Sequence, residues 1–119
     1  MNAAILKFPP ATPNWTTVCH IDDVAPNTGV CALVGGRHIA VFRVGEDKFF
    51  AIDNVDSKAG ASVLSRGLVG SLGRRIVVAS PLHKQHYELS TGECLEFPEH
   101  SVQTYPVCIL GTQVQLTLP

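Results

Sequence analysis

The stretch that decides the fold is "SPLHKQHYELSTGECL", from Ser80 to Leu95. It begins with a proline-containing loop, passes through a short run around Tyr87, and reaches "STGE", a cluster of turn-forming residues, before "CL". Serine, glycine and proline are typical of turns, whereas aromatic residues in alternating patterns are typical of strands. The stretch therefore predicts a strand end, a tight loop, a short strand, a turn and another strand.

The same pattern of short strands and turns continues on both sides of this stretch. In "QVQLTL", Val114, Leu116 and Leu118 alternate with polar residues, which is the period of two expected for a half-buried strand. The one helical candidate is the short segment 61–65. Many short strands separated by turns favour an antiparallel β-sandwich or barrel. The strands that we expect are 15–20, 29–34, 37–44, 48–53, 68–70, 74–79, 87–89, 93–95, 102–110 and 113–118.

Pro106 lies inside one of these expected strands. A proline has no N–H to donate to a β-ladder, so it is rarely found in a central strand. We therefore expect this strand to lie at the edge of a sheet, or Pro106 to sit where its nitrogen faces outward.

The length and composition indicate one ordinary globular domain. The chain has 119 residues, 45% of them hydrophobic, and a net charge of −1. We expect an irregular N-terminal arm over residues 1–13 and a single domain over residues 14–119. The absence of basic excess argues against nucleic-acid binding. No apolar run reaches the roughly 20 residues that a bilayer span requires, and no signal peptide is recognisable, so we expect no membrane association and a cytoplasmic location.

The four cysteines, Cys19, Cys31, Cys94 and Cys108, form no Cys-x-x-Cys pair. Each lies in a strand-like segment among apolar neighbours. We therefore expect them to act as small buried hydrophobic residues. Reactive or metal-bound thiols are the alternative.

Two loops, residues 54–70 and 79–95, resemble the cluster-binding loops of the Rieske [2Fe-2S] family. The resemblance depends on Gly60-Ala61, Leu64-Ser65 and Thr91-Gly92, and it extends over nearly the whole chain. It implies an all-β, Rieske-like antiparallel sandwich or barrel with two loop tips and at most one short helix.

The ligands of that family do not recur in this chain. The family carries Cys-x-His in the first loop and Cys-x-x-His in the second, and these positions fall on Asp56, Lys58, Ser80 and His83. Only the last matches. A Rieske cluster needs thiolates on one iron and imidazoles on the other, and a protonated lysine repels a ferric centre. We therefore expect no cluster and no other cofactor on this chain, with His83 and His86 as weak candidates for a different metal.

The same four positions suggest a substitute for the metal. If the two loops approach each other as in the family, Asp56 and Lys58 of one tip lie near Ser80 and His83 of the other. We hypothesise that a carboxylate set against an ammonium or imidazole holds the loops together, with a modest contribution to stability if the pair is exposed.

Within the Rieske-like group, "VLSRGLVG" and "VASPLHKQHYELSTGECL" are similar to the family of small subunits of cytoplasmic NAD(P)H-dependent nitrite reductases. This resemblance implies an accessory subunit of an enzyme that reduces nitrite to ammonia in nitrate assimilation. Its partner would be the large subunit, which carries FAD, siroheme and an iron–sulfur centre. No catalytic residues are then expected on this chain. The expected contacts with the large subunit are Asp56, Lys58, Arg66, His83, Lys84 and His86.

Two further possibilities remain open from the sequence. The hairpin over residues 102–118 has an edge that could support weak self-association. The alternative function is a Rieske-type [2Fe-2S] electron-transfer ferredoxin serving another oxidoreductase, such as an oxygenase. A bound cluster would distinguish this carrier from an accessory subunit.

Overall fold

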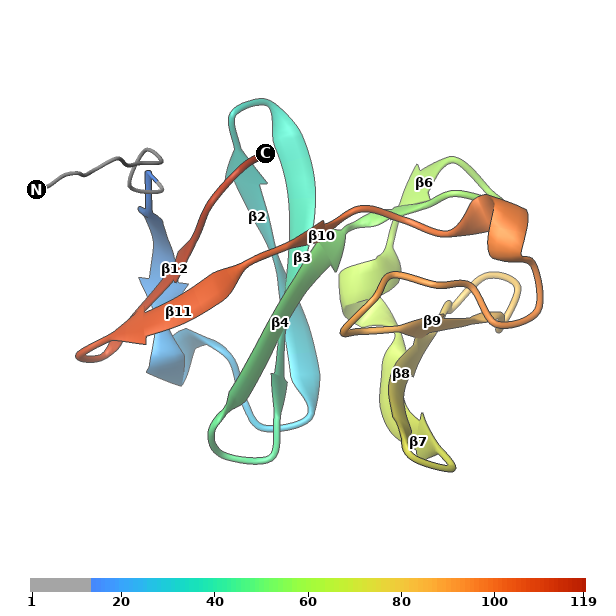
Figure 1. Cartoon of the computed structure of the whole chain (residues 1–119), viewed down its shortest axis with the longest axis horizontal. Helices are drawn as coiled ribbons and strands as arrows, with labels where there is room; N and C mark the ends of the chain where they lie inside the picture. The colour runs from blue at the N-terminus through green and yellow to red at the C-terminus, as the bar shows by residue number, and fades with distance from the viewer. Residues whose placement is uncertain (1–13) are drawn as a thin grey trace, which may run out of the picture.

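The computed structural model describes residues 14–119, so the arm expected over residues 1–13 lies outside the described residues. The chain forms two lobes, with β1–β4 and β10–β12 in the larger lobe and β5–β9 in the smaller lobe (Figure 1). The all-β prediction is confirmed. The strands are β1 (Thr16–His20), β2 (Thr28–Val34), β3 (Arg37–Val44), β4 (Lys48–Asp53), β5 (Val55–Asp56), β6 (Ala61–Ser62), β7 (Leu68–Leu72), β8 (Arg75–Ala79), β9 (His86–Glu88), β10 (Thr104–Tyr105), β11 (Val107–Leu110) and β12 (Gln113–Leu116). The short 3-10 helices are η1 (Ile21–Asp23), η2 (Leu64–Arg66) and η3 (Pro98–His100).

Strand β3 is the centre of the molecule because both of its faces are buried. Ile39 and Val41 face one hydrophobic cluster, whereas Ala40 and Phe42 face a second cluster, and all four side chains are fully buried. A strand that is covered on both sides is apolar at every position instead of at alternate ones. The unbroken apolar run "IAVF" therefore places β3 between two layers.

The larger lobe consists of two antiparallel sheets. One has the order β1-β12-β11 and the other has the order β10-β4-β3-β2. The chain changes sheets at Pro106, since Tyr105 pairs with Ala51 in one sheet and Val107 pairs with Leu116 in the other. Both β10 and β11 are edge strands, which confirms the expected edge position of Pro106.

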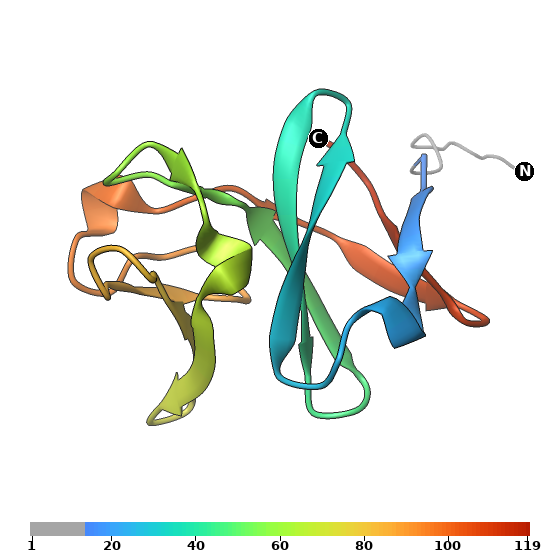
Figure 2. The ribbon, with the colours of Figure 1, turned by 180° about the vertical axis from the view of Figure 1, so that it is seen from behind.

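The smaller lobe is formed by one continuous segment of the chain between β4 and β10. The two ends of this segment lie side by side, because Asp53 N donates to Gln103 O at 2.9 Å and Gln103 N donates to the Asp53 carboxylate at 3.3 Å. Its two small sheets, β5-β6 and β7-β8-β9, lie on the side of β3 and β4 opposite to β11 and β12 in both views (Figures 1 and 2). The two loop tips belong to this lobe.

Several expected boundaries are wrong in detail. The strand expected over 93–95 is reduced to an isolated bridge between Tyr87 and Cys94. The helical candidate at 61–65 is divided between β6 and η2. The strand expected over 102–110 is interrupted at Pro106, because the two halves belong to different sheets. Within residues 14–119, no helix has the length and hydropathy needed to cross a membrane.

Candidate functional site

The two loop tips meet at a buried pair of side chains. Asp56 is the last residue of β5, and the Gly60 N–H donates to its carbonyl oxygen at 2.7 Å, which closes the turn of the first loop. Ser80 directly follows β8, and the Lys84 N–H donates to its carbonyl oxygen at 3.0 Å, which closes the second loop. The Ser80 hydroxyl donates a short hydrogen bond to the Asp56 carboxylate. The expectation that Asp56 lies near Ser80 is thus confirmed, but the partner of the carboxylate is a hydroxyl and not the expected ammonium or imidazole.

The carboxylate of Asp56 is fully buried and receives donors on both oxygens. Its Oδ1 accepts hydrogen bonds from the backbone N–H groups of Lys58 at 2.9 Å and Ala59 at 3.0 Å. The same atom accepts a bond from Gln85 Nε2 at 2.9 Å, while Oδ2 accepts the bond from Ser80. A buried carboxylate is stable only when it is paired or well hydrogen-bonded, and these four donors meet that requirement.

Two residues of this network, Gln85 and Tyr87, were missed by the sequence analysis. Gln85 Nε2 donates to the Tyr87 hydroxyl at 3.0 Å, and that hydroxyl lies 3.1 Å from Ser57 Oγ. Gln85 Oε1 is the one buried side-chain oxygen or nitrogen without a partner among residues 14–119. The signal that could have found them is their spacing, because Gln85 directly precedes β9 and residues two apart in an extended chain face the same side.

Burial and hydrogen bonding act in opposite directions on the pKa of Asp56. Burial raises it, but the hydrogen bonds from Ser80, from the backbone of Ala59 and Lys58, and from Gln85 outweigh burial and hold the pKa below its usual value. Asp56 is therefore an ionised, firmly held acceptor at neutral pH. A carboxyl group in this state is unsuited to general acid catalysis.

We expect the stabilising effect of the Asp56 charge to disappear in acid. Because the folded-state pKa lies below the unfolded value of about 3.9, the ionised group stabilises the fold fully above that value, and the effect is lost as the pH falls through the folded pKa. Urea unfolding of the wild type and Asp56→Asn, from about pH 6 to about pH 2.5, measures this. The stability difference between the two proteins should shrink toward low pH, and a difference that grows contradicts the assignment.

The remaining residues of the expected clamp do not join it. Lys58 is exposed and its Nζ lies 3.9 Å from the centre of the Phe97 ring, in a cation–π contact. His83 is exposed on the second loop. The part of the hypothesis that placed Lys58 and His83 in the clamp is wrong, because the carboxylate of Asp56 is satisfied by uncharged donors instead.

The six expected partner contacts are not equivalent in the structure. Asp56 is fully buried, so it cannot touch a partner, and its inclusion is corrected. Arg66, Lys84 and His86 line one groove of about 460 Å³, whereas Lys58 and His83 lie outside it. His86 is also held by Glu96, whose carboxylate lies 2.6 Å from its Nδ1.

The residues at the loop tips do not fit a [2Fe-2S] cluster. The two positions expected to supply thiolates hold a carboxylate and a hydroxyl that are hydrogen-bonded to each other, so they fill the space between the loops by themselves. Among the described residues, no group of three or more His, Cys, Asp or Glu side chains is arranged to hold a metal. The donor chemistry, with one imidazole at His83 and no sulfur, is that of a polar clamp.

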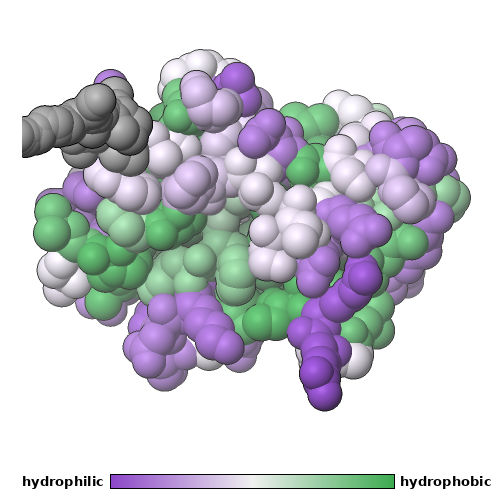
Figure 3. Space-filling model, in the orientation of Figure 1, coloured by the Kyte–Doolittle hydropathy of each residue, from purple (hydrophilic) through white to green (hydrophobic). Residues whose placement is uncertain are grey.

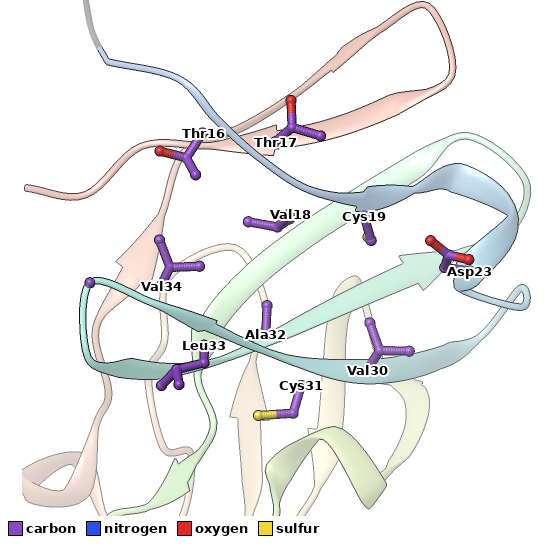
Figure 4. Close-up of a pocket in the computed structure, with 11 residues that line it drawn as sticks. Thr16, Thr17, Val18, Cys19, Asp23, Val30, Cys31, Ala32, Leu33 and Val34 are labelled. Atoms are coloured by element: carbon purple, nitrogen blue, oxygen red, sulfur yellow. The ribbon is translucent and has the colours of Figure 1, made fainter.

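The cysteines lie elsewhere and differ in exposure. Cys94 is fully buried, but Cys31 is exposed, which corrects the expectation that all four are buried. Burial raises the pKa of both Cys19 and Cys94, with a further contribution to Cys19 from Asp23, so their thiols are poor nucleophiles at neutral pH. Cys19 and Cys31 border a hollow of about 470 Å³ between β1 and β2, where Val18 and Ala32 point toward each other (Figure 4). Asp23 also lines this hollow, but among the described residues no three His, Cys, Asp or Glu side chains are arranged to hold a metal there.

Comparison with known proteins identifies the class to which this fold and clamp belong. The sequence matches the Rieske-like [2Fe-2S] domain family over residues 14–117, and the chain belongs to that family. Within it, the chain is 48% identical to the nitrite reductase (NADH) small subunit of Salmonella typhimurium, over 86% of this chain and 95% of that protein. It is also 40% identical to a segment of the nitrite reductase [NAD(P)H] large subunit of Klebsiella oxytoca, over 88% of this chain and 11% of that protein.

Solved structures give the same classification. The putative NADH-dependent nitrite reductase small subunit of Mycobacterium tuberculosis superposes with a TM-score of 0.86 at 38% identity, covering 92% of this chain and 98% of that one. The ferredoxin of carbazole 1,9a-dioxygenase from Nocardioides aromaticivorans superposes with a TM-score of 0.73 at 27% identity, covering 92% of this chain and 100% of that one. The predicted resemblance to both the Rieske-like group and its nitrite reductase branch is confirmed.

Proposed function

We propose that this chain is the accessory small subunit of an NAD(P)H-dependent nitrite reductase and that it carries no [2Fe-2S] cluster. The hydrogen-bonded pair of Asp56 and Ser80 is the observation that carries this proposal. The two loops are held together by polar side chains where the family uses metal ligands, so the scaffold is maintained without redox chemistry of its own. The 48% identity to a nitrite reductase small subunit supports the assignment.

The partner in this proposal is the large subunit, on which the FAD, siroheme and iron–sulfur centre would reside. The Klebsiella oxytoca large subunit contains a segment 40% identical to this chain, which occupies 11% of its length. Such a segment is covalently held beside the rest of its enzyme. A separate chain of the same fold would reach the comparable position by docking. The candidate contacts are the exposed residues Lys58, Arg66, His83 and Lys84, together with the half-buried His86. The proposed unit is a single domain over residues 14–119 that acts in the cytoplasm.

A Rieske-type ferredoxin for another oxidoreductase is the second candidate. Its support is the similarity in fold to the carbazole dioxygenase ferredoxin and a 31% identity to the anthranilate 1,2-dioxygenase ferredoxin subunit of Burkholderia cepacia. Electron transfer by such a protein requires a bound cluster. The side chains at the loop tips therefore favour the accessory subunit over the carrier.

We expect the chain to be colourless and free of iron, and to bind the large subunit. After anaerobic purification and incubation with iron and sulfide, a cluster-free domain should contain less than about 0.1 iron per chain, whereas a loaded [2Fe-2S] protein contains about two. A Rieske ferredoxin treated in parallel shows that the procedure works. An affinity-tagged chain should also retain the siroheme-containing large subunit on a column. Stoichiometric iron and acid-labile sulfide would favour the ferredoxin, and the absence of complex formation would contradict the accessory role.

A further inference from the structure

A groove with positively charged side chains lies beside the second loop tip. It has a volume of about 460 Å³, and its apolar lining comes from Leu68, Ala79 and Pro81. Arg66 and Lys84 also line it, and both are exposed. The groove therefore combines an apolar surface with two cationic side chains.

The two cations are electrostatically uncompensated. Within residues 14–119, neither Arg66 nor Lys84 has a carboxylate within ion-pair distance. Two carboxylates of this lobe have other partners: Glu96 pairs with His86, and Asp56 is fully buried and hydrogen-bonded to its own donors. This positive site stands out because the chain as a whole has a net charge of −1. An interface with a localised charge of one sign selects a partner surface of the opposite sign.

Apolar side chains in the groove and beside it are open to solvent. Leu68 is 80% exposed at the start of β7, and Leu82 is 49% exposed on the adjacent loop. Strand β7 is the outer strand of its sheet, so its other edge has no strand partner among the described residues. Exposed apolar side chains beside a free strand edge are typical of a surface that another chain covers.

The backbone of Lys84 adds an independent indication. Lys84 has a φ of 61°, and Asn27 is the other non-glycine residue with positive φ among the described residues. A glycine would adopt this conformation without strain, whereas lysine does so at a cost. Strained positions of this kind are frequent at functional sites, where the surrounding structure holds them in place. Here the side chain lines the groove.

We propose that this groove, formed by Arg66, Leu68, Ala79, Pro81 and Lys84, binds an acidic segment of the nitrite reductase large subunit that inserts one apolar side chain. This inference rests on the proposed function. It reduces the docking surface proposed there, which covered both loop tips, to this one groove. The apolar side chain of the partner packs against Leu68. The carboxylates of the segment lie against Arg66 and Lys84.

The test measures the affinity of the full chain for the purified large subunit, using matched pairs of variants. Leu68→Ser removes the main apolar side chain of the groove, and Leu33→Ser is its control, because Leu33 is 71% exposed on β2 and does not line the groove. Lys84→Glu reverses a charge of the groove, and Lys48→Glu is its control at the exposed start of β4. Lys84→Gly removes the side chain while it relieves the backbone, so it should fold at least as stably as the wild type. We expect each groove variant to weaken binding about tenfold or more, and each control to change it less than about twofold.

The outcomes separate this inference from the proposed function. If the wild type does not bind the large subunit, the proposed function fails. If the wild type binds but the groove variants bind equally well, the assignment of the groove as the docking site is overturned. The same holds if Lys58→Glu, outside the groove, weakens binding as much as Lys84→Glu. Wild-type affinity should fall between about 50 and about 300 mM NaCl, and a salt-independent affinity overturns the acidic partner. Sedimentation of the chain alone tests whether a second copy of the chain occupies the groove. Ile109 and Leu110 form the exposed hydrophobic end of the β11–β12 hairpin and serve as the comparison (Figure 3). Self-association that is abolished by Leu68→Ser, but not by changes at Ile109 and Leu110, would overturn the proposal of an acidic segment in the groove.

Discussion

Replacing Asp56 by alanine is expected to lower the free energy of unfolding by about 3 kcal/mol or more and the melting temperature by about 10 °C or more. The substitution removes the acceptor for the Ser80 hydroxyl, the Gln85 amide and two backbone N–H groups, all around a fully buried position. Each buried donor left without a partner carries the cost of its lost hydration. Urea unfolding at neutral pH and a thermal melt followed by circular dichroism measure the two quantities.

The matched control for this variant is Asp47→Ala. Asp47 is exposed in the hairpin between β3 and β4, and a surface substitution of this kind changes stability by less than about 0.5 kcal/mol. Asp56→Asn should be intermediate, because the amide keeps one oxygen acceptor but turns a donor toward Ser80. If Asp56→Ala were as stable as the control, the clamp would have no role in holding the loop tips together, and the tips would have to be stabilised by their apolar contacts alone.

The strands were predictable because their signals are local. Alternation in "QVQL" and the glycine turns mark β12 and the hairpins, and the observed bounds of β3 and β4 coincide with the expected ones. The burial of β3 on both faces follows from "IAVF". The division of 102–110 was not predictable in the same way, since which sheet each half joins depends on partners far away in sequence.

The loop tips were predictable by position but not by chemistry. The resemblance to the Rieske family implied that Asp56 and Ser80 lie close together, and they do. The sequence did not indicate that Gln85 would supply a donor, or that Lys58 would lie over Phe97 instead of against a carboxylate. Both choices are decided by three-dimensional packing, because a lysine side chain is long enough to reach several acceptors and an exposed ion pair gains little.

Replacing Gly92 by alanine is expected to destabilise the protein by about 4 kcal/mol or more, enough to unfold a marginally stable domain. Gly92 has a φ of 79°, and a Cβ there would lie 2.1 Å from the carbonyl oxygen of Val102. That carbonyl belongs to a backbone that is fixed to Gly92 itself, because the Val102 N–H donates to Gly92 O at 2.8 Å. The clash therefore cannot be relieved by rotating a side chain.

Gly73→Ala separates the two causes of this effect. Gly73 has a φ of 62° in the turn between β7 and β8, but a Cβ there would meet nothing within 4 Å, so only the left-handed backbone cost of about 1 kcal/mol applies. A loss at Gly92 that is no larger than the loss at Gly73 would contradict the steric argument. The difference in stability between the two variants measures the steric cost at the contact of Gly92 with Val102. The segment between these two residues carries Glu96, which holds His86 beside the groove. A Gly92→Ala protein that still folds should therefore bind the large subunit more weakly, whereas Gly73→Ala should bind it like the wild type.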